Sequence, residues 1–239
     1  MKLQFLPLLQ LQRDLYALPR GRGRFEEYLR TLRDPETGDL KLPLVAMNPM
    51  GKEHLAPFLD RLLDADAEGM GERAVMEAAV ALPPVGGSFQ AGFVVADDLH
   101  GGWTNRAATE FGQCFRLSAL LKRGFITAAL WTSEAYAPAR LREEMLLAVH
   151  RAAFVLEHGE ARTLAEALRQ EAAAADRAKI VRVKASAAEL AEAREVLAPY
   201  MQRTEEPILI AALYGDEAAR DLGFQALGVR GRAAFSLAG

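Results

Sequence analysis

The segment VVADDLHGGWTNRAATEF, residues 94–111, places several reactive side chains directly after an apolar run. Asp97, Asp98 and His100 are residue types that transfer protons or bind hard metal ions. Successive side chains at the end of a strand point to opposite faces, so we expect at most one of the two aspartates to share a site with His100. These three residues are the candidate catalytic groups.

The second half of the same segment has residue types that hold a ligand. Gly101 and Gly102 let the backbone approach a bound group closely. Thr104 suits the N-cap of a following helix, whose free backbone N–H groups favour an anion. Trp103 and Asn105 are expected to shape the pocket, and Trp103 can stack on a planar ligand.

Arg106 has two explanations. A cation in the first turn of a helix opposes the helix dipole and costs up to about 1 kcal/mol, which a nearby anion offsets. That anion is either a bound ligand or the side chain of Asp97 or Asp98. In the first case the loop at 97–106 is a binding site, and in the second it is a structural staple.

A second candidate loop, NPMGKEH at 48–54, also joins a predicted strand (42–49) to a predicted helix. Lys52 is a candidate anion ligand or base, and His54 could join it. The alternative is a solvated helix start. If the strand at 42–49 lies parallel and adjacent to the one at 90–96, both loops share one edge of the sheet.

Hydrophobic periodicity and turn residues predict alternating strands and helices. Helices are expected at about 8–18, 25–33, 52–63, 68–82, 104–121, 137–158, 164–178, 187–200 and 216–222. Strands are expected at 42–49, 90–96, 124–131, 179–185 and 207–215, with a weaker edge-strand signal at 229–238. This order predicts a helix-rich α/β layered fold around a mixed or mostly parallel sheet of about four to six strands.

Helix ends carry their own signals. Thr163 with Glu166, and Ser186 with Glu189, have the spacing of capping boxes. Gly159 is a natural C-terminal cap. We treat residues 1–239 as one domain, with a possible subdivision at the loop signal of 83–87.

Composition limits the function classes. The chain has 29 basic and 32 acidic residues and a formal net charge of -3, which gives no overall attraction to nucleic acid. One cysteine, Cys114, excludes an intramolecular disulfide. No segment approaches the roughly 20 apolar residues that span a bilayer, and the N-terminus is a poor signal peptide. We therefore expect a cytoplasmic protein without a membrane or nucleic-acid partner.

Two functional hypotheses follow. The first is a small-molecule enzyme or binding protein that holds an anionic ligand at residues 97–106. The second is a non-catalytic interaction or scaffold protein, and its Ala- and Leu-rich helices are compatible with a homo-oligomer. The sequence identifies no cofactor, metal or reaction: there is no G-x-S-x-G nucleophile elbow, and GGSFQAG lacks the ending of a P-loop.

Overall fold

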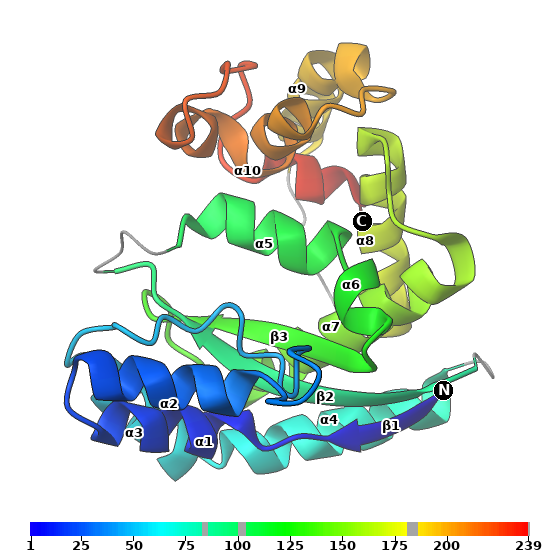
Figure 1. The fold of residues 1–239 in the computed structure, drawn as a ribbon. Helices are drawn as coiled ribbons and strands as arrows, with labels where there is room; N and C mark the ends of the chain where they lie inside the picture. The colour runs from blue at the N-terminus through cyan, green and yellow to red at the C-terminus, as the bar shows by residue number, and fades with distance from the viewer. Residues whose placement is uncertain (83–85, 100–103, 181–185, 239) are drawn as a thin grey trace.

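A computed structural model describes residues 1–82, 86–99, 104–180 and 186–238 (Figure 1). In these ranges three parallel strands form one sheet in the order β1-β2-β3. The strands are β1 (Lys2–Phe5), β2 (Ser88–Ala96) and β3 (Phe125–Trp131). This confirms a helix-rich α/β fold with a parallel sheet, but the described sheet has fewer strands than the four to six that we expected.

Ten α-helices occupy most of the described chain. They are α1 (Leu8–Ala17), α2 (Arg22–Leu32), α3 (Leu55–Asp64), α4 (Ala67–Ala81), α5 (Arg106–Phe115), α6 (Ser118–Leu121), α7 (Pro138–His158), α8 (Leu164–Arg177), α9 (Ala187–Leu197) and α10 (Glu206–Asp221). There are two short 3₁₀ helices: η1 (Ala198–Tyr200) directly follows α9, and η2 (Ala233–Ala238) follows α10. No described helix combines the length and apolarity needed to cross a bilayer.

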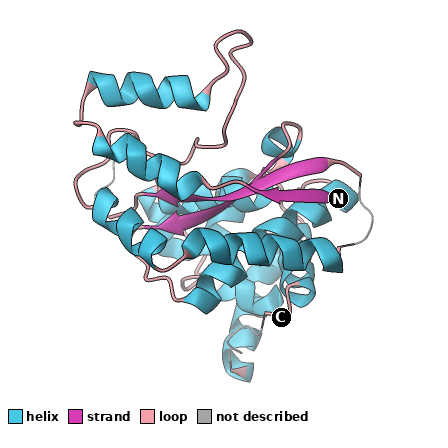
Figure 2. Ribbon diagram, turned by 90° about the horizontal axis from the view of Figure 1, so that it is seen from below, coloured by secondary structure: helices cyan, strands magenta, loops and turns pink. Residues whose placement is uncertain are grey.

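The sheet is covered on both faces (Figures 1 and 2). Helices α4 and α7 pack against each other and against the strands on one face, and α5 and α6 lie on the other. Gly71 in α4 permits this packing, because a Cβ at this position would lie 2.5 Å from the ring of Phe5 and 2.6 Å from that of Phe93. Helices α9 and α10 lie farthest from the sheet.

A helix side chain closes part of one sheet edge. The short strand β1 pairs only with the first half of β2. Farther along β2, the backbone N–H of Val95 donates to Oε1 of Gln12 at 2.9 Å, and Nε2 of Gln12 donates to the carbonyl of Phe93 at 3.2 Å. The buried Gln12 amide in α1 thus takes the place of a neighbouring strand.

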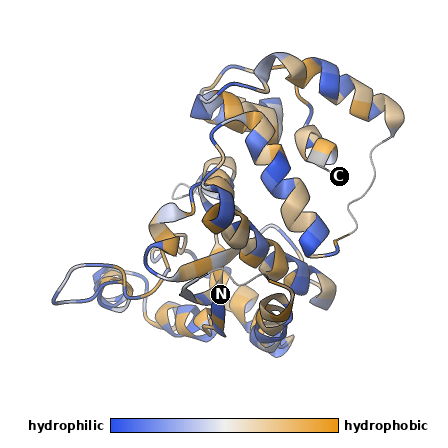
Figure 3. Ribbon diagram, turned by 90° about the vertical axis from the view of Figure 1, so that its right-hand side faces the viewer, coloured by the Kyte–Doolittle hydropathy of each residue, from blue (hydrophilic) through white to orange (hydrophobic). Residues whose placement is uncertain are grey.

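Buried apolar residues form two clusters. The first joins the sheet to α1–α4 and α7, and includes Leu9, Met47, Leu59, Phe93 and Met145. The second joins α5 to α8–α10 and η2, and includes Phe111, Phe115, Leu164, Leu197 and Leu213. In Figure 3 the helices of both parts mix hydrophilic and hydrophobic residues along their length, as amphipathic helices do. Helix α5 therefore belongs to the second core although it lies over the sheet.

Many sequence signals are confirmed. The expected strands at 90–96 and 124–131 are β2 and β3, and the long helix at 137–158 is α7. Both capping boxes form with their reciprocal hydrogen bonds. Gly159 ends α7 with a φ of 81°. The expected strand at 179–185 falls largely on residues 181–185, outside the described residues.

The predicted strand at 42–49 is wrong. The segment is a loop with local turns, in which the N–H of Met47 donates to the carbonyl of Leu44. Tyrosine hydroxyls supply part of its remaining backbone hydrogen bonds: Tyr28 donates to the carbonyl of Leu44, and Tyr16 donates to that of Asn48. An apolar run can therefore be buried here without a strand partner.

The predicted strand at 207–215 is also wrong, because this segment is the first half of α10. Residues 209–215 are all buried, so the sequence shows neither the period of a strand nor that of a helix. Gly215 kinks the helix with a φ of 90°. A Cβ there would lie 2.4 Å from the carbonyl oxygen of Gly231, so the close approach also requires glycine.

The chain end and the chain start both differ from expectation. The weak strand signal at 229–238 corresponds to turns and the 3₁₀ helix η2. Asp216, the first residue of the helix expected at 216–222, lies within α10 and accepts hydrogen bonds from the backbone N–H groups of residues 227–229. The strand β1 was not predicted, since its four residues alternate between exposed and half-buried positions and give no apolar run.

Candidate functional site

Asp97 and Asp98 follow β2 and point to different surroundings, as expected for consecutive residues at a strand end. The Asp97 side chain is 1% exposed, and its Oδ1 accepts a hydrogen bond from Oγ1 of Thr132 at 2.9 Å. The same Oδ1 lies 2.9 Å from Nε2 of His54. The Asp98 carboxylate lies beside Arg106 and Ser133, and its Oδ1 also lies 3.1 Å from the Thr132 hydroxyl. One carboxylate is therefore internal, whereas the other faces the cleft described below.

The contact between His54 and Asp97 joins the start of α3 to the end of β2. The loops at 48–54 and 97–106 thus meet through His54, although the strand at 42–49 on which the expected shared sheet edge depended is absent. Lys52 is exposed in the turn before α3. Its role as an anion ligand stays a prediction.

Two hydrogen bonds position the loop at 48–54. The hydroxyl of Tyr16 donates to the carbonyl of Asn48 at 2.7 Å, and Arg24 donates to the carbonyl of Gly51 at 3.1 Å. Burial, and secondly the charge of Asp97, raise the pKa of Tyr16, so its hydroxyl remains a hydrogen-bond donor at neutral pH. The loop is therefore a rigid support for His54.

Helix α5 begins one residue later than expected. Oδ1 of Asn105 accepts from the backbone N–H of Ala108 at 3.0 Å, so Asn105 is the N-cap and the prediction for Thr104 is wrong. Thr104 Oγ1 donates instead to the carbonyl of Asp97 at 2.6 Å. Both residue types cap helices well, and the bond to Asp97 determines which one does so here.

Four candidate residues cannot be placed. His100, Gly101, Gly102 and Trp103 lie outside the described residues, so their catalytic and binding roles stay predictions.

Arg106 is surrounded by carboxylates of the protein itself. Its guanidinium donates to Asp98 Oδ2 and to Ser133 Oγ, both at 3.1 Å, and to Glu134. It also lies over the ring of Trp131, 5.2 Å from the ring centre. Burial favours a lower pKa, but the nearby carboxylates outweigh it, so that the pKa of Arg106 is raised. The anion that the helix start requires is therefore present without a ligand.

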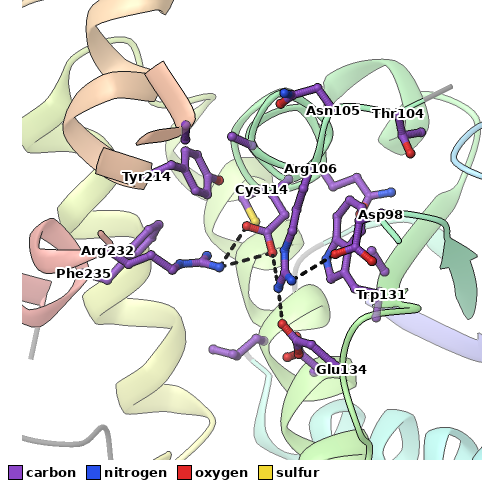
Figure 4. Close-up of a pocket in the computed structure, with 18 of the residues that line it drawn as sticks. Asp98, Thr104, Asn105, Arg106, Cys114, Trp131, Glu134, Tyr214, Arg232 and Phe235 are labelled. Atoms are coloured by element: carbon purple, nitrogen blue, oxygen red, sulfur yellow. Dashed lines mark hydrogen bonds and ion pairs between the residues drawn. The ribbon is translucent and has the colours of Figure 1, made fainter. Parts of the chain in front are cut away.

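Asp98 and Arg106 line an open cleft of about 880 Å³ (Figure 4). On the sheet side the lining comes from β3, α5 and α7, and on the other side from α8, α10 and η2. The second group includes Tyr214, Arg232 and Phe235. Sequence reasoning missed this wall, because residues 207–215 and 229–238 were expected to be strands.

Ion pairs form a continuous series through the cleft. The series runs from Arg232 to Glu110 (2.9 Å), Arg106 (3.6 Å), Glu134, Arg140 (3.8 Å) and Glu144 (2.6 Å). A separate buried pair joins Arg151 to Glu171 at 2.7 Å. Altogether the described lining contains seven carboxylates and four guanidinium groups, and each of these four arginines has a carboxylate partner.

Two further polar groups face this space. Burial raises the pKa of Cys114 to about 12, so its thiol is protonated at neutral pH and is a weak nucleophile. The side chain of Tyr214 is 7% exposed, and Figure 4 shows its hydroxyl pointing toward Cys114. Within the described residues this hydroxyl has no hydrogen-bond partner. A buried hydroxyl without a partner costs about 1–3 kcal/mol, which a bound molecule can recover.

No group of three or more His, Cys, Asp or Glu side chains in the described ranges is placed to hold a metal ion. Comparisons with protein-family models, curated proteins and solved structures found no match for this chain.

Proposed function

We propose that this protein binds a small polar molecule with at least one positively charged group in the cleft between β3, α5 and α7 on one side and α10 and η2 on the other. The observation that carries the proposal is the excess of carboxylates over guanidinium groups in the lining. Walls of low dielectric strengthen the field of such an excess and attract a cation.

The carboxylates that remain for a ligand are at the mouth of the cleft. Glu217 and Asp221 on α10 are exposed, and no ion pair among the described residues involves either of them. The Tyr214 hydroxyl offers a hydrogen bond deeper in the cleft. We expect the cationic group of the ligand to lie between the two carboxylates at the mouth and the Tyr214 hydroxyl.

The anionic ligand expected from the sequence stays a prediction, but Arg106 no longer argues for it. Any anion would compete with Asp98 and Glu134 for the guanidinium. The same contacts favour the second candidate function, an interaction or scaffold protein in which Arg106 is a staple. We propose no reaction, because the candidate His100 lies outside the described residues and Cys114 is a protonated thiol.

The test is a thermal-shift titration with putrescine and arginine amide as cationic probes and citrate as an anionic probe. We expect the cations to raise the melting temperature, because a ligand of the folded state stabilises it by mass action. The double variant Glu217→Gln with Asp221→Asn should weaken that effect at least fivefold. Glu195→Gln, an exposed carboxylate on α9 outside the cleft, is the matched control. Stabilisation by citrate alone would favour the anionic ligand, and no effect of any probe would favour the scaffold.

A further inference from the structure

The outer edge of β3 opens into the same cleft. The N–H of Gln90 donates to the carbonyl of Gly124 at 2.7 Å, and the N–H of Thr132 donates to that of Ala96 at 3.2 Å. With the parallel register of β2 and β3, these bonds show that the backbone N–H and C=O groups of the even-numbered residues of β3 point toward β2. The N–H and C=O groups of Thr127 and Ala129 therefore point away from β2, in the plane of the sheet.

These outward groups have no partner in the described structure. Farther along the edge, the N–H of Trp131 donates to the hydroxyl of Tyr136 at 2.6 Å, and the N–H of Glu134 donates to the carbonyl of Trp131 at 3.0 Å. Among the described residues, no hydrogen bond reaches the outward groups of Thr127 or Ala129, and both residues line the cleft. Within the described ranges, the edge is therefore closed at Trp131 and unpaired at Thr127 and Ala129.

We infer that the ligand of the cleft is an extended peptide segment with basic side chains, which adds to β3 as a fourth strand. This rests on the proposed function, since both use the same cleft. Two N–H and two C=O groups alternate along the edge of Thr127 to Ala129. A peptide backbone repeats the complementary pattern at the same spacing, whereas a compact cation does not.

The surroundings of the edge fit such a chain. A new strand lies about 4.8 Å from β3, and its side chains alternate between the two faces of the sheet. One face leads to α5, with Glu110, and the other leads to α7, with Glu144. A lysine or arginine side chain therefore meets a carboxylate on whichever face it lies, in competition with the arginines that pair with Glu110 and Glu144. The excess of negative charge selects a basic segment over an acidic one.

The experiment measures binding of the labelled peptide Lys-Val-Lys-Val-Lys, with blocked ends, to the full-length protein by fluorescence anisotropy. Two versions carry N-methyl groups, one at the first, third and fifth residues and the other at the second and fourth. They have equal charge, but only one set of amides faces β3 in a paired strand. We expect one version to bind at least tenfold more weakly than the other. The acidic peptide Glu-Val-Glu-Val-Glu should bind at least tenfold more weakly than the unmodified basic peptide.

A protein variant gives the reciprocal test. Ala129→Pro removes the outward N–H without removing a hydrogen bond to β2, and Ala129→Ser keeps that N–H. We expect a loss of at least tenfold in peptide affinity for the proline variant and less than twofold for the serine variant. Circular dichroism shows whether the proline variant folds. If it does not fold, the methylated peptides alone test whether the ligand pairs with β3.

Three results would overturn the inference, and they separate it from the proposed function. Equal binding of all three basic peptides would indicate attraction by charge alone, and the proposed function would stand. Binding of putrescine without binding of the peptide would also leave the proposed function intact. If neither bound, both would fail.

Discussion

The two sides of the carboxyl end of β2 differ in what their polar groups contact. Toward α1 and α3, Gln12 and Asp97 are buried and hydrogen-bonded within the fold. Toward the cleft, Asp98 and Arg106 belong to a series of ion pairs that borders open space. Both carboxylates are largely buried, with 1% of the Asp97 side chain and 9% of the Asp98 side chain exposed, but only Asp98 borders open space. Neighbouring residues of the same type thus have different surroundings.

The largest effect should come from Asp97→Ala. Its carboxylate is almost fully buried, accepts hydrogen bonds from Thr132 and from the N–H of Leu99, and contacts His54, so its loss removes several buried polar contacts at once. We expect a loss of about 2–4 kcal/mol in the free energy of unfolding, measured by urea titration. Asp98→Ala, one residue away, should cost less. A larger cost for Asp98 would reverse the comparison between the two sides.

Gln12→Leu should have the next largest effect. The substitution keeps the size of the side chain but leaves the N–H of Val95 and the carbonyl of Phe93 without their partner. We expect a loss of about 1–3 kcal/mol in unfolding free energy. The control is Gln10→Leu on the exposed face of α1, with an expected change within about 0.5 kcal/mol. Equal effects would show that the amide does not close the sheet edge.

Arg106→Gln should have a smaller effect on stability and a gain in ligand affinity. The guanidinium is one-third exposed and shared among several carboxylates, so we expect a cost of about 0.5–1.5 kcal/mol. Because the cleft loses a positive charge, putrescine should bind several-fold more tightly in calorimetric titrations. Weaker binding of putrescine would instead indicate that Arg106 supports ligand binding.

The smallest effect concerns pH. Burial raises the pKa of Glu144, although Arg140 opposes the shift. A carboxyl whose pKa is raised by folding binds its proton more tightly in the folded state than in the unfolded state. Its contribution to the free energy of unfolding therefore falls as the pH rises above 4.5, the ordinary pKa of a glutamate. The melting temperature of Glu144→Gln, minus that of the wild type, should therefore increase from pH 4 to pH 7.

The sequence predicted the elements whose apolar pattern is bounded by turns. Strands β2 and β3 are continuous apolar runs between glycines and polar loops, and both were found. The run at 207–215 looks the same but is helical, because burial on all sides removes the periodic signal. Strand β1 was missed for the opposite reason, since it is short and half exposed.

The candidate site was predictable only where its residues are close in sequence. The alternative pairing of Arg106 with Asp98 needed only the helix dipole and a neighbouring carboxylate, and the structure contains that pair. Arg232 and Glu134 join the same network from distant segments. Their approach depends on the packing of η2 and α7 around the cleft, which no local pattern specifies.

The Gln12 side chain, which pairs with β2 where a neighbouring strand would, also affects self-association. Sheets aggregate when a long open edge pairs with the edge of another molecule. In the described sheet, β1 presents an edge of only four residues, and Gln12 occupies the backbone of β2 beyond it. In the described structure, the unpaired part of β3 lines the cleft that α5 and α7 also border. The fold therefore discourages edge-to-edge polymerisation while admitting a single narrow chain.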